Sequence, residues 1–105
     1  MENNITKNYF GTWEGYGTPI QLSYPLPKKE ALTRKAYYIG YYDLNEKLIG
    51  YDKYLDGKIY GHTDYKYNEN GRLIESENIN YISGYQLKIT FDEKGKMIKR
   101  EFYKK

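Results

Sequence analysis

Tyr-Lys-Tyr-Asn-Glu-Asn-Gly-Arg-Leu-Ile, residues 65–74, is the stretch from which the fold can be worked out. It has the pattern of a strand end, a polar turn and the start of the next strand. Asn68 can hydrogen-bond its side chain to the backbone two residues on, and Gly71 can adopt the positive φ that closes such a turn. Residues 41–49 and 90–98 repeat the order of an aromatic residue, Asp, a turn, a basic residue and two aliphatic residues. The pattern predicts a repeated β-hairpin.

The first copy of this unit has Glu46 where the others have glycine. We expect its turn to be the most strained of the three, and Asn45 to take the left-handed conformation. Two further corners, Asp56-Gly57 and Ser83-Gly84, predict tight, two-residue hairpin loops. Turns spaced roughly every 12 residues predict an antiparallel meander of about six strands from Lys35 to the C-terminus.

Composition limits the chain to a single domain, because 105 residues can form one core and leave no room for a second. Cys is absent, which excludes disulfides, a thiol nucleophile and Cys-ligated metal. The polar start of the chain has no apolar run of the length that a secretory signal or a membrane span needs, so we expect a cytoplasmic protein without membrane contact. The 17 Lys and Arg and the 14 Asp and Glu are interspersed and give a net charge of +3, as on an ordinary solubilising surface.

Aromatic content is the unusual feature, with 15 Tyr, three Phe and one Trp. A tyrosine buries a large ring but keeps a hydroxyl that needs water or a partner, which favours a thin sheet with many rings near its surface. The fold class we predict is mainly β: a single-domain antiparallel meander of six or seven strands, as a curved sheet or partly closed barrel, with one short helix near 28–34. The terminal lysines after the last strand suit a sheet edge that must not pair with another molecule.

Along the chain, we expect residues 1–8 to be flexible, 9–34 to hold a strand, a Pro-rich loop and the short helix, and 35–105 to form the hairpin-repeat sheet. Three prolines predict the loop at 18–27. Trp13, among glycines, is expected to fold over one face of the sheet.

Two strands carry the clearest expectations about which side chains are buried. In residues 85–91, the apolar set is expected to be buried and the polar set to face water; the apolar set is Tyr85, Leu87, Ile89 and Phe91, and the polar set is Gln86, Lys88 and Thr90. In residues 72–81, Glu75 and Glu77 share a face with apolar residues, and neither carboxylate can be buried without a partner. A β-bulge near Ser76, or an outward bend, is expected to resolve this conflict.

His62, the only histidine, would share a strand face with Tyr60 and Asp64. Asp64 could orient the imidazole and Tyr60 could act as an acid, which leaves an enzyme as one alternative. The ordinary interpretation is a histidine on a wet face. The acidic pairs at 75/77 and 92/93 are interpreted as solvated, and we predict no catalytic residue, no metal and no cofactor.

A binding role follows from the excess of rings over what one thin core can hold, since Tyr and Arg anchor protein interfaces. We predict a non-enzymatic protein-binding module, possible also as a homodimer. The predicted partner-binding residues are Tyr60, His62, Asp64, Tyr65, Lys66, Tyr67, Arg72 and Lys88. Two alternatives stay open: a Tyr/Lys face that stacks single-stranded nucleic acid, and a barrel-like pocket lined by tyrosines and Trp13 that holds a small ligand.

The unit at 65–73 resembles the Tyr-Asp repeat of bacterial Rhs proteins, which is an aromatic residue, Asp, two residues, Gly, Arg and Leu. It also resembles the MORN-variant repeats of small bacterial antitoxins, with Asn68 in place of Asp and Glu46 in place of Gly in the first copy. That resemblance implies an immunity or antitoxin protein that neutralises a toxin by covering its active site. The positive net charge favours a toxin with a neutral or acidic surface. Residues 10–17 and 36–38 are similar to a family of small uncharacterised bacterial proteins.

Overall fold

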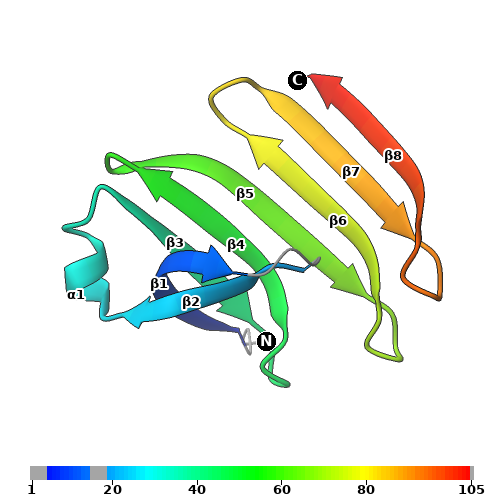
Figure 1. The fold of residues 1–105 in the computed structure, drawn as a ribbon, viewed down its shortest axis with the longest axis horizontal. Coiled ribbons are helices and arrows are strands. Elements are labelled where there is room, and N and C mark those ends of the chain that lie inside the picture. The colour runs from blue at the N-terminus through cyan, green and yellow to red at the C-terminus, as the bar shows by residue number, and fades with distance from the viewer. Residues whose placement is uncertain (1–4, 15–18, 105) are drawn as a thin grey trace.

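The computed structural model describes residues 5–14 and 19–104, which form one antiparallel sheet and a short helix (Figure 1). The strand order is β2-β1-β3-β4-β5-β6-β7-β8, so that from β3 onward every strand pairs with the next one in the chain. The elements are β1 (Thr6–Glu14), β2 (Gln21–Leu26), α1 (Lys28–Ala31), β3 (Ala36–Tyr42), β4 (Leu48–Leu55), β5 (Lys58–Tyr67), β6 (Leu73–Asn80), β7 (Tyr85–Phe91) and β8 (Met97–Lys104). The predicted antiparallel meander with one short helix is confirmed, and the sheet stays open rather than closing into a barrel.

The sheet has eight strands rather than six or seven, because the Pro-rich segment contains a strand. β2 lies at the sheet edge, where it pairs with β1 alone, and Pro25 lies opposite Phe10. An edge strand tolerates proline because one side of its backbone needs no hydrogen-bond partner. β1 begins at Thr6, so residues 6–8 of the segment expected to be flexible belong to a strand, while residues 1–4 and 15–18 lie outside the described residues.

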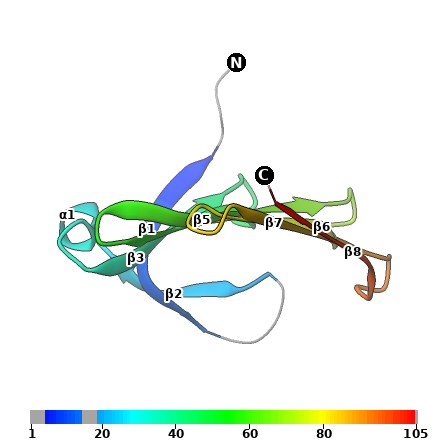
Figure 2. The same cartoon turned by 90° about the horizontal axis from the view of Figure 1, so that it is seen from above.

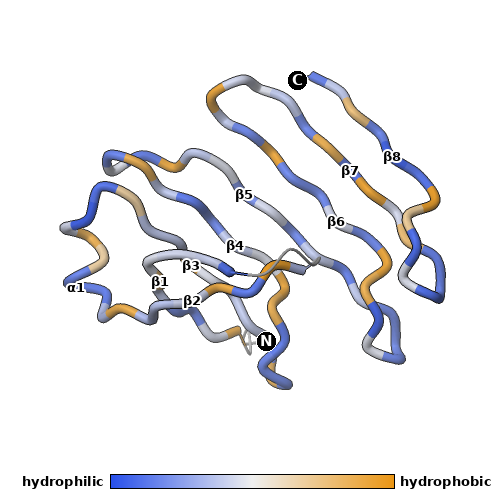
Figure 3. The backbone as a smooth tube through the Cα atoms, in the orientation of Figure 1, coloured by the Kyte–Doolittle hydropathy of each residue, from blue (hydrophilic) through white to orange (hydrophobic). Residues whose placement is uncertain are grey.

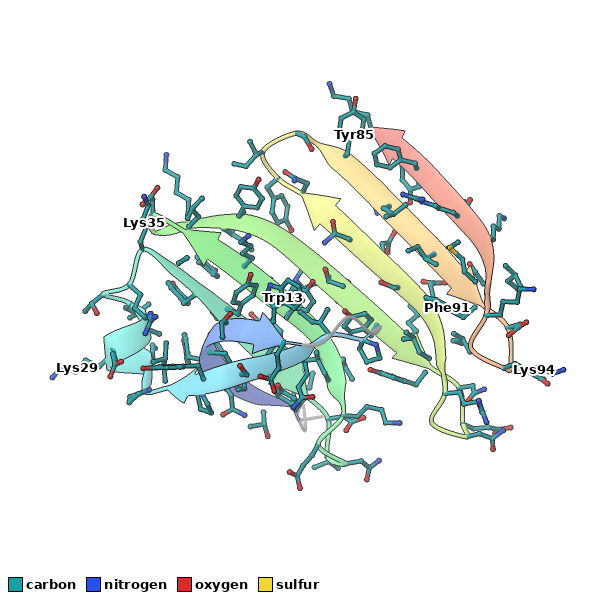
Figure 4. All side chains as sticks on the ribbon, in the orientation of Figure 1. Trp13, Lys29, Lys35, Tyr85, Phe91 and Lys94 are labelled. Atoms are coloured by element: carbon teal, nitrogen blue, oxygen red, sulfur yellow. The ribbon has the colours of Figure 1, made fainter. Side chains whose placement is uncertain are left out.

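The β1–β2 hairpin folds back over part of the sheet. β1 pairs with β3 through residues 6–10 and with β2 through residues 9–14, and it bends between the two so that β2 lies across one face of the sheet (Figure 2). We call this the front face and the opposite one the back face. Trp13, at the end of β1, lies over β4 and β5 as expected (Figure 4).

Two clusters of buried side chains hold the hairpin and the helix to the sheet. On the front, residues of the hairpin pack against β3–β5; the buried members are Phe10, Leu22, Tyr38, Leu48 and Tyr65. Successive side chains of β3 point to opposite faces, and those on the back pack against α1. Ala31 of α1 is fully buried there. The buried members of this second cluster are Leu26, Ala31, Tyr37 and Ile39. All the buried members of the two clusters lie between β1 and β5 in the chain, so the core lies in its first part.

The three repeat turns have the same structure. Each begins with a side-chain oxygen that accepts two backbone N–H groups at 2.8–3.0 Å; these oxygens are Oδ1 of Asp43, Asn68 and Asp92. Each also has one residue at positive φ, namely Glu46 (60°), Gly71 (81°) and Gly95 (84°). The expectation that Asn45 takes the left-handed conformation is wrong, because the turn geometry fixes the glycine position and Glu46 occupies it.

The other two corners differ from each other. Asp56 and Gly57 both have positive φ and join β4 directly to β5, which confirms the two-residue turn. The Ser83-Gly84 corner is a four-residue loop, 81–84, and the expected two-residue loop is wrong. Asn80 shapes it, since its Oδ1 accepts the backbone N–H groups of Ile82 and Ser83 at 2.9 and 3.0 Å. The local side-chain acceptor stabilises a wider turn.

The bulge expected near Ser76 lies two residues nearer the turn. Lys66 is opposite Glu75 and Tyr67 is opposite Leu73, which leaves Ile74 as the extra residue. Ser76 itself is buried in regular pairing with both neighbouring strands. The bulge moves the Leu73 side chain to the front, where Leu73 and Tyr67 pack against the buried cluster. Glu75 and Glu77 lie on the back.

The burial expected for β7 is wrong at Tyr85 and Gln86. Its apolar residues share the front face as predicted, but all are at least partly exposed, whereas Gln86 is only 8% exposed. Gln86 lies on the back, where its Nε2 donates to Glu77 Oε2 at 2.6 Å. No described element lies in front of β7, so the alternation is right, but the front row is not sealed from water as expected.

Candidate functional site

The structure divides the predicted binding residues between two faces and a turn. The back face holds His62, Asp64, Lys66 and Lys88, the front face holds Tyr60, Tyr65 and Tyr67, and Arg72 lies in the turn before β6. Tyr65 is 6% exposed and is part of the core, where its hydroxyl accepts the Ile20 backbone N–H at 3.3 Å. These residues therefore do not make one continuous surface.

His62 lies in a hydrogen-bonded network on the back face that spans β3, β4 and β5. Its Nδ1 is 2.5 Å from Asp52 Oδ1, and its Nε2 is 2.8 Å from Asp64 Oδ1. Tyr41 donates its hydroxyl hydrogen to Asp52 Oδ2 at 2.5 Å. Asp52 is buried and Asp64 is mostly exposed, so the imidazole joins a buried carboxylate to the surface.

Sequence reasoning placed Tyr60 beside His62 and missed Asp52 and Tyr41. Counting back from the Asp56-Gly57 turn puts Asp52 opposite residue 61. A bulge at Tyr60 shifts the pairing by one residue, so that Asp52 lies opposite His62 and Tyr60 lies on the front. Nothing in the local sequence marks this bulge, and the network is visible only once the register is known.

The charges of the network follow from its contacts. The hydrogen bond with Asp52 raises the pKa of His62 to about 9; burial opposes the rise and Asp64 adds to it. Burial acts to raise the pKa of Asp52, but the hydrogen bonds from His62 and Tyr41 outweigh it and hold that pKa below its ordinary value. At neutral pH His62 is thus an imidazolium between two carboxylates, with both ring nitrogens engaged.

This arrangement suits cross-strand stabilisation better than proton transfer, since a general base needs a free nitrogen lone pair near its substrate. Within residues 5–14 and 19–104, no group of three His, Cys, Asp or Glu side chains is arranged to hold a metal ion.

On the back of β6–β8, charged and polar side chains pair across the strands. Lys66 and Lys88 lie 3.4 and 3.5 Å from the carboxylate of Glu75. Glu77 accepts hydrogen bonds from Gln86 and from the hydroxyl of Tyr103, the latter at 3.3 Å. Both glutamates therefore have partners, and this surface carries charges of both signs.

The front of β7 and β8 carries a different surface, which we call the open patch: Tyr85, Leu87, Ile89, Arg100, Phe102 and Lys104. Their cross-strand pairs are Tyr85 with Lys104, Leu87 with Phe102 and Ile89 with Arg100. Apolar segments recur along these strands in Figure 3. Phe102 is 64% exposed and stacks on Tyr85 with ring centroids 5.0 Å apart. The acidic residues of β6–β8 all lie in the alternate, back-facing rows.

The hollows on the front side include a groove and a smaller cavity that contain predicted binding residues. A groove of about 570 Å³ at the turn end is lined by Arg72, Lys47 and Tyr67, among others. Lys47 Nζ donates to the Gly71 carbonyl at 2.7 Å and lies 4.7 Å from the Tyr67 ring centroid. Burial raises the pKa of Tyr67 to about 12, with Asp43 adding to the rise. A smaller cavity, of about 250 Å³, lies beneath Trp13.

Comparison with known families assigns this chain to one of them. A family model described as a family of unknown function, DUF6156, matches residues 2–100. The chain belongs to DUF6156. No curated protein and no solved structure matches it. The DUF6156 match extends from β1 into β8; it includes β7 and Arg100 of the open patch and ends before Phe102 and Lys104. Among the described residues of this DUF6156 protein, no helix has the length and apolar character needed to cross a membrane.

Proposed function

We propose that this DUF6156 protein is a non-enzymatic binding module that docks the acidic surface of another protein on its open patch. The observation that carries the proposal is the composition of the patch. Its exposed rings and aliphatic side chains lie between two cations, Arg100 and Lys104, and no carboxylate of β6–β8 shares its rows.

The patch has the chemistry of a protein interface. Exposed aromatic rings give much contact area at small entropic cost, and arginine is enriched beside them at interface centres. Lys104 Nζ lies 5.4 Å from the Tyr85 ring centroid, so its charge is held at the border of the apolar area. Since unlike charges attract across an interface and like charges are rejected, a partner with carboxylates around an apolar centre fits best.

The back-face network supports the non-enzymatic part of the proposal. His62 is the only histidine, and both of its nitrogens are committed to aspartates. It therefore offers no free base at neutral pH.

The resemblance of the repeat unit to MORN-variant antitoxins supports a more specific role. The partner would then be a cytoplasmic toxin, and the module would neutralise it by covering an active site that carries acidic groups. An acidic site of this kind agrees with the net charge of +3 and with the cations of the patch.

A nucleic acid would meet the same rings and cations, but the geometry suits it less well. Single-stranded nucleic acid binds by stacking its bases on free ring faces. The rings of Tyr85 and Phe102 stack on each other at an interplanar angle of 17°, and this contact occupies one face of each ring.

The test compares two neighbouring residues that point to opposite faces. A photo-crosslinking amino acid replaces Phe102 on the front or Tyr103 on the back, and the protein is expressed in its native host. We expect a single stoichiometric adduct from position 102 and none from position 103. The captured partner is then purified, and its affinity for the unmodified chain is measured by calorimetry.

A charge reversal on each face tests whether the complex depends on the cations of the open patch. Arg100→Glu on the front is expected to weaken the purified complex at least about tenfold, and Lys99→Glu on the back to leave it unchanged. The proposal is overturned by an adduct from position 103 alone, by a partner with a basic surface, by a self-adduct of two copies, or by equal effects of the two reversals. Salt-sensitive binding of a single-stranded oligonucleotide that Arg100→Glu abolishes would instead assign the patch to nucleic acid.

A further inference from the structure

We propose that the cavity beneath Trp13 binds a small planar carboxylate, a single aromatic ring carrying one negative charge. The cavity lies between the β1–β2 hairpin and the front of the sheet and measures about 250 Å³. It is separate from the open patch, and the inference does not depend on the protein-docking proposal.

Aromatic rings from four strands line this cavity. They belong to Trp13 of β1, Tyr38 of β3, Tyr51 of β4 and Tyr60 of β5, and Ile20 adds an aliphatic side chain. The rings of Tyr38 and Tyr51 are tilted by 55° with centroids 6.2 Å apart, so they do not cover each other by stacking. Trp13 is 44% exposed. A ligand in the cavity would cover part of this large ring and gain contact area from it. The walls therefore suit a flat, apolar body.

Lys53 gives the cavity its charge preference. Its Nζ lies 5.1 Å from the ring centroid of Tyr60 and 5.9 Å from that of Tyr38. Among the described residues, no carboxylate lies within ion-pair distance of this ammonium. A half-buried cation without a counter-ion disfavours a second cation and attracts an anion, because the surrounding rings lower the local dielectric. An aromatic cage would otherwise prefer a cationic ligand, and Lys53 excludes that choice.

The size of the cavity limits the ligand. Sites for drug-sized molecules usually measure about 300 to 1,000 Å³, so this one lies below that range and matches one ring with a short acidic substituent. A carboxylate on a one-carbon arm can reach the Lys53 ammonium while its ring lies between Trp13 and the tyrosines. Phenylacetate has this shape and serves as the probe.

Trp13 is the only tryptophan, so its fluorescence reports directly on the cavity. Titration of the purified chain with phenylacetate is expected to change the Trp13 emission with a Kd below about 1 mM, as for an efficient ligand of ten heavy atoms. Phenylacetamide, which has the same shape without the charge, is expected to bind at least about tenfold more weakly. Phenethylammonium, which carries the opposite charge, is expected not to bind.

Variants assign the charge effect to one lysine. Lys53→Met keeps the apolar stem and is expected to weaken phenylacetate binding at least about tenfold, whereas Lys53→Arg keeps the charge and most of the affinity. Lys99→Met, on the exposed back of β8, is the matched control and is expected to bind as the wild type does. Circular dichroism shows whether each variant is folded, and the comparison of acid with amide on the wild-type chain needs no variant.

Four results would overturn the proposal: equal affinity for the acid and the amide, tighter binding of phenethylammonium, unchanged binding by Lys53→Met, or no saturable response to phenylacetate up to about 10 mM. Saturation with uridine monophosphate, with none from phenylacetate, would assign the site to nucleotides instead.

Discussion

Strands β3–β5 and strands β6–β8 each contain one of the repeat turns and carry aromatic rings on the front face, but the β1–β2 hairpin lies mainly over the first set (Figure 2). Under the hairpin, Tyr65 is 6% exposed; beyond it, Phe102 is 64% exposed. Both side chains are aromatic rings on strands with alternating patterns. The comparison teaches that a strand's own sequence sets which side chains share a face, while a distant segment decides which face is dry.

The back faces of the two halves differ in the same direction. Behind the covered half, Asp52 and His62 form a network whose central carboxylate is buried. Behind the open half, Glu75 forms ion pairs with lysines that are themselves partly or mostly exposed. We therefore expect perturbations of the first half to change stability far more than matched perturbations of the second.

The largest expected difference comes from truncating one ring in each half. Tyr65→Ala removes a buried ring and is expected to lower the free energy of unfolding by about 3 to 5 kcal/mol. Phe102→Ala removes an exposed ring and is expected to change it by less than about 0.5 kcal/mol. Urea unfolding followed by circular dichroism measures both. Equal losses would mean that the open patch is covered in solution, and the contrast between the halves would fail.

The second difference concerns pH, because only the covered half contains the His62 network. The pKa of His62 is raised from 6.5 to about 9 in the folded chain, so the folded state holds this proton more tightly than the unfolded state. Its contribution to stability is complete below pH 6.5 and is lost as the pH rises through about 9. Allowing for screening of a partly exposed group, we expect a loss of up to about 2 kcal/mol across that range.

Urea midpoints measured from pH 6 to 10 test this slope, with His62→Gln as the variant that removes the titrating group. The variant is expected to be less stable near neutral pH and to have a flat profile where the wild type falls. A wild-type profile that stays flat over this range would show that the imidazolium gains nothing from Asp52 and Asp64 in the folded protein.

The repeat turns allow a smaller comparison of the halves at one backbone position. Glu46→Gly removes the backbone strain of a non-glycine residue held at a φ of 60°. It is expected to raise the free energy of unfolding by about 0.5 to 1 kcal/mol. Gly95→Ala imposes the opposite change at a φ of 84°, where a Cβ would meet no atom within 4 Å, and is expected to lower it by about 1 kcal/mol. Asn45→Gly, one residue away from the strained position, is the control and is expected not to stabilise. Amide hydrogen exchange then shows whether the Gly95→Ala effect stays within β7 and β8 or spreads to β3–β5.

The turns explain why much of the fold was predictable from the sequence. A side-chain acceptor at Asp43, Asn68 or Asp92 and a positive-φ residue three positions later, which is glycine in two of the three turns, act through local contacts alone. Spacing of these turns then predicts an antiparallel meander, and Pro27 predicts the start of the short helix. These features depend on neighbours in the chain, which the sequence displays directly.

Features that depend on distant neighbours were predicted less well. β2 was taken for a loop because three prolines lie within or beside it. Pro25, the one inside the strand, excludes only a central position, and an edge position depends on the whole sheet. The partners of His62 were missed because one bulge, at Tyr60, moves Asp52 into line with it. Gln86 was taken for a wet residue because nothing in β7 indicates that Glu77 of β6 and Tyr103 of β8 lie beside it on the back.

The smallest expected effect comes from the partly exposed ion pairs behind the open half. Glu75→Gln removes the charge that faces Lys66 and Lys88 at 3.4 and 3.5 Å but keeps the shape of the side chain. Exposed pairs gain little in water, so the free energy of unfolding should fall by only about 0.5 kcal/mol, and less in high salt. Asp52→Asn makes the same chemical change in the buried network and should cost several times more, since it leaves His62 without its main partner. If the two substitutions had equal cost and equal salt dependence, the back faces would not differ as their burial indicates, and the contrast would hold for the front alone.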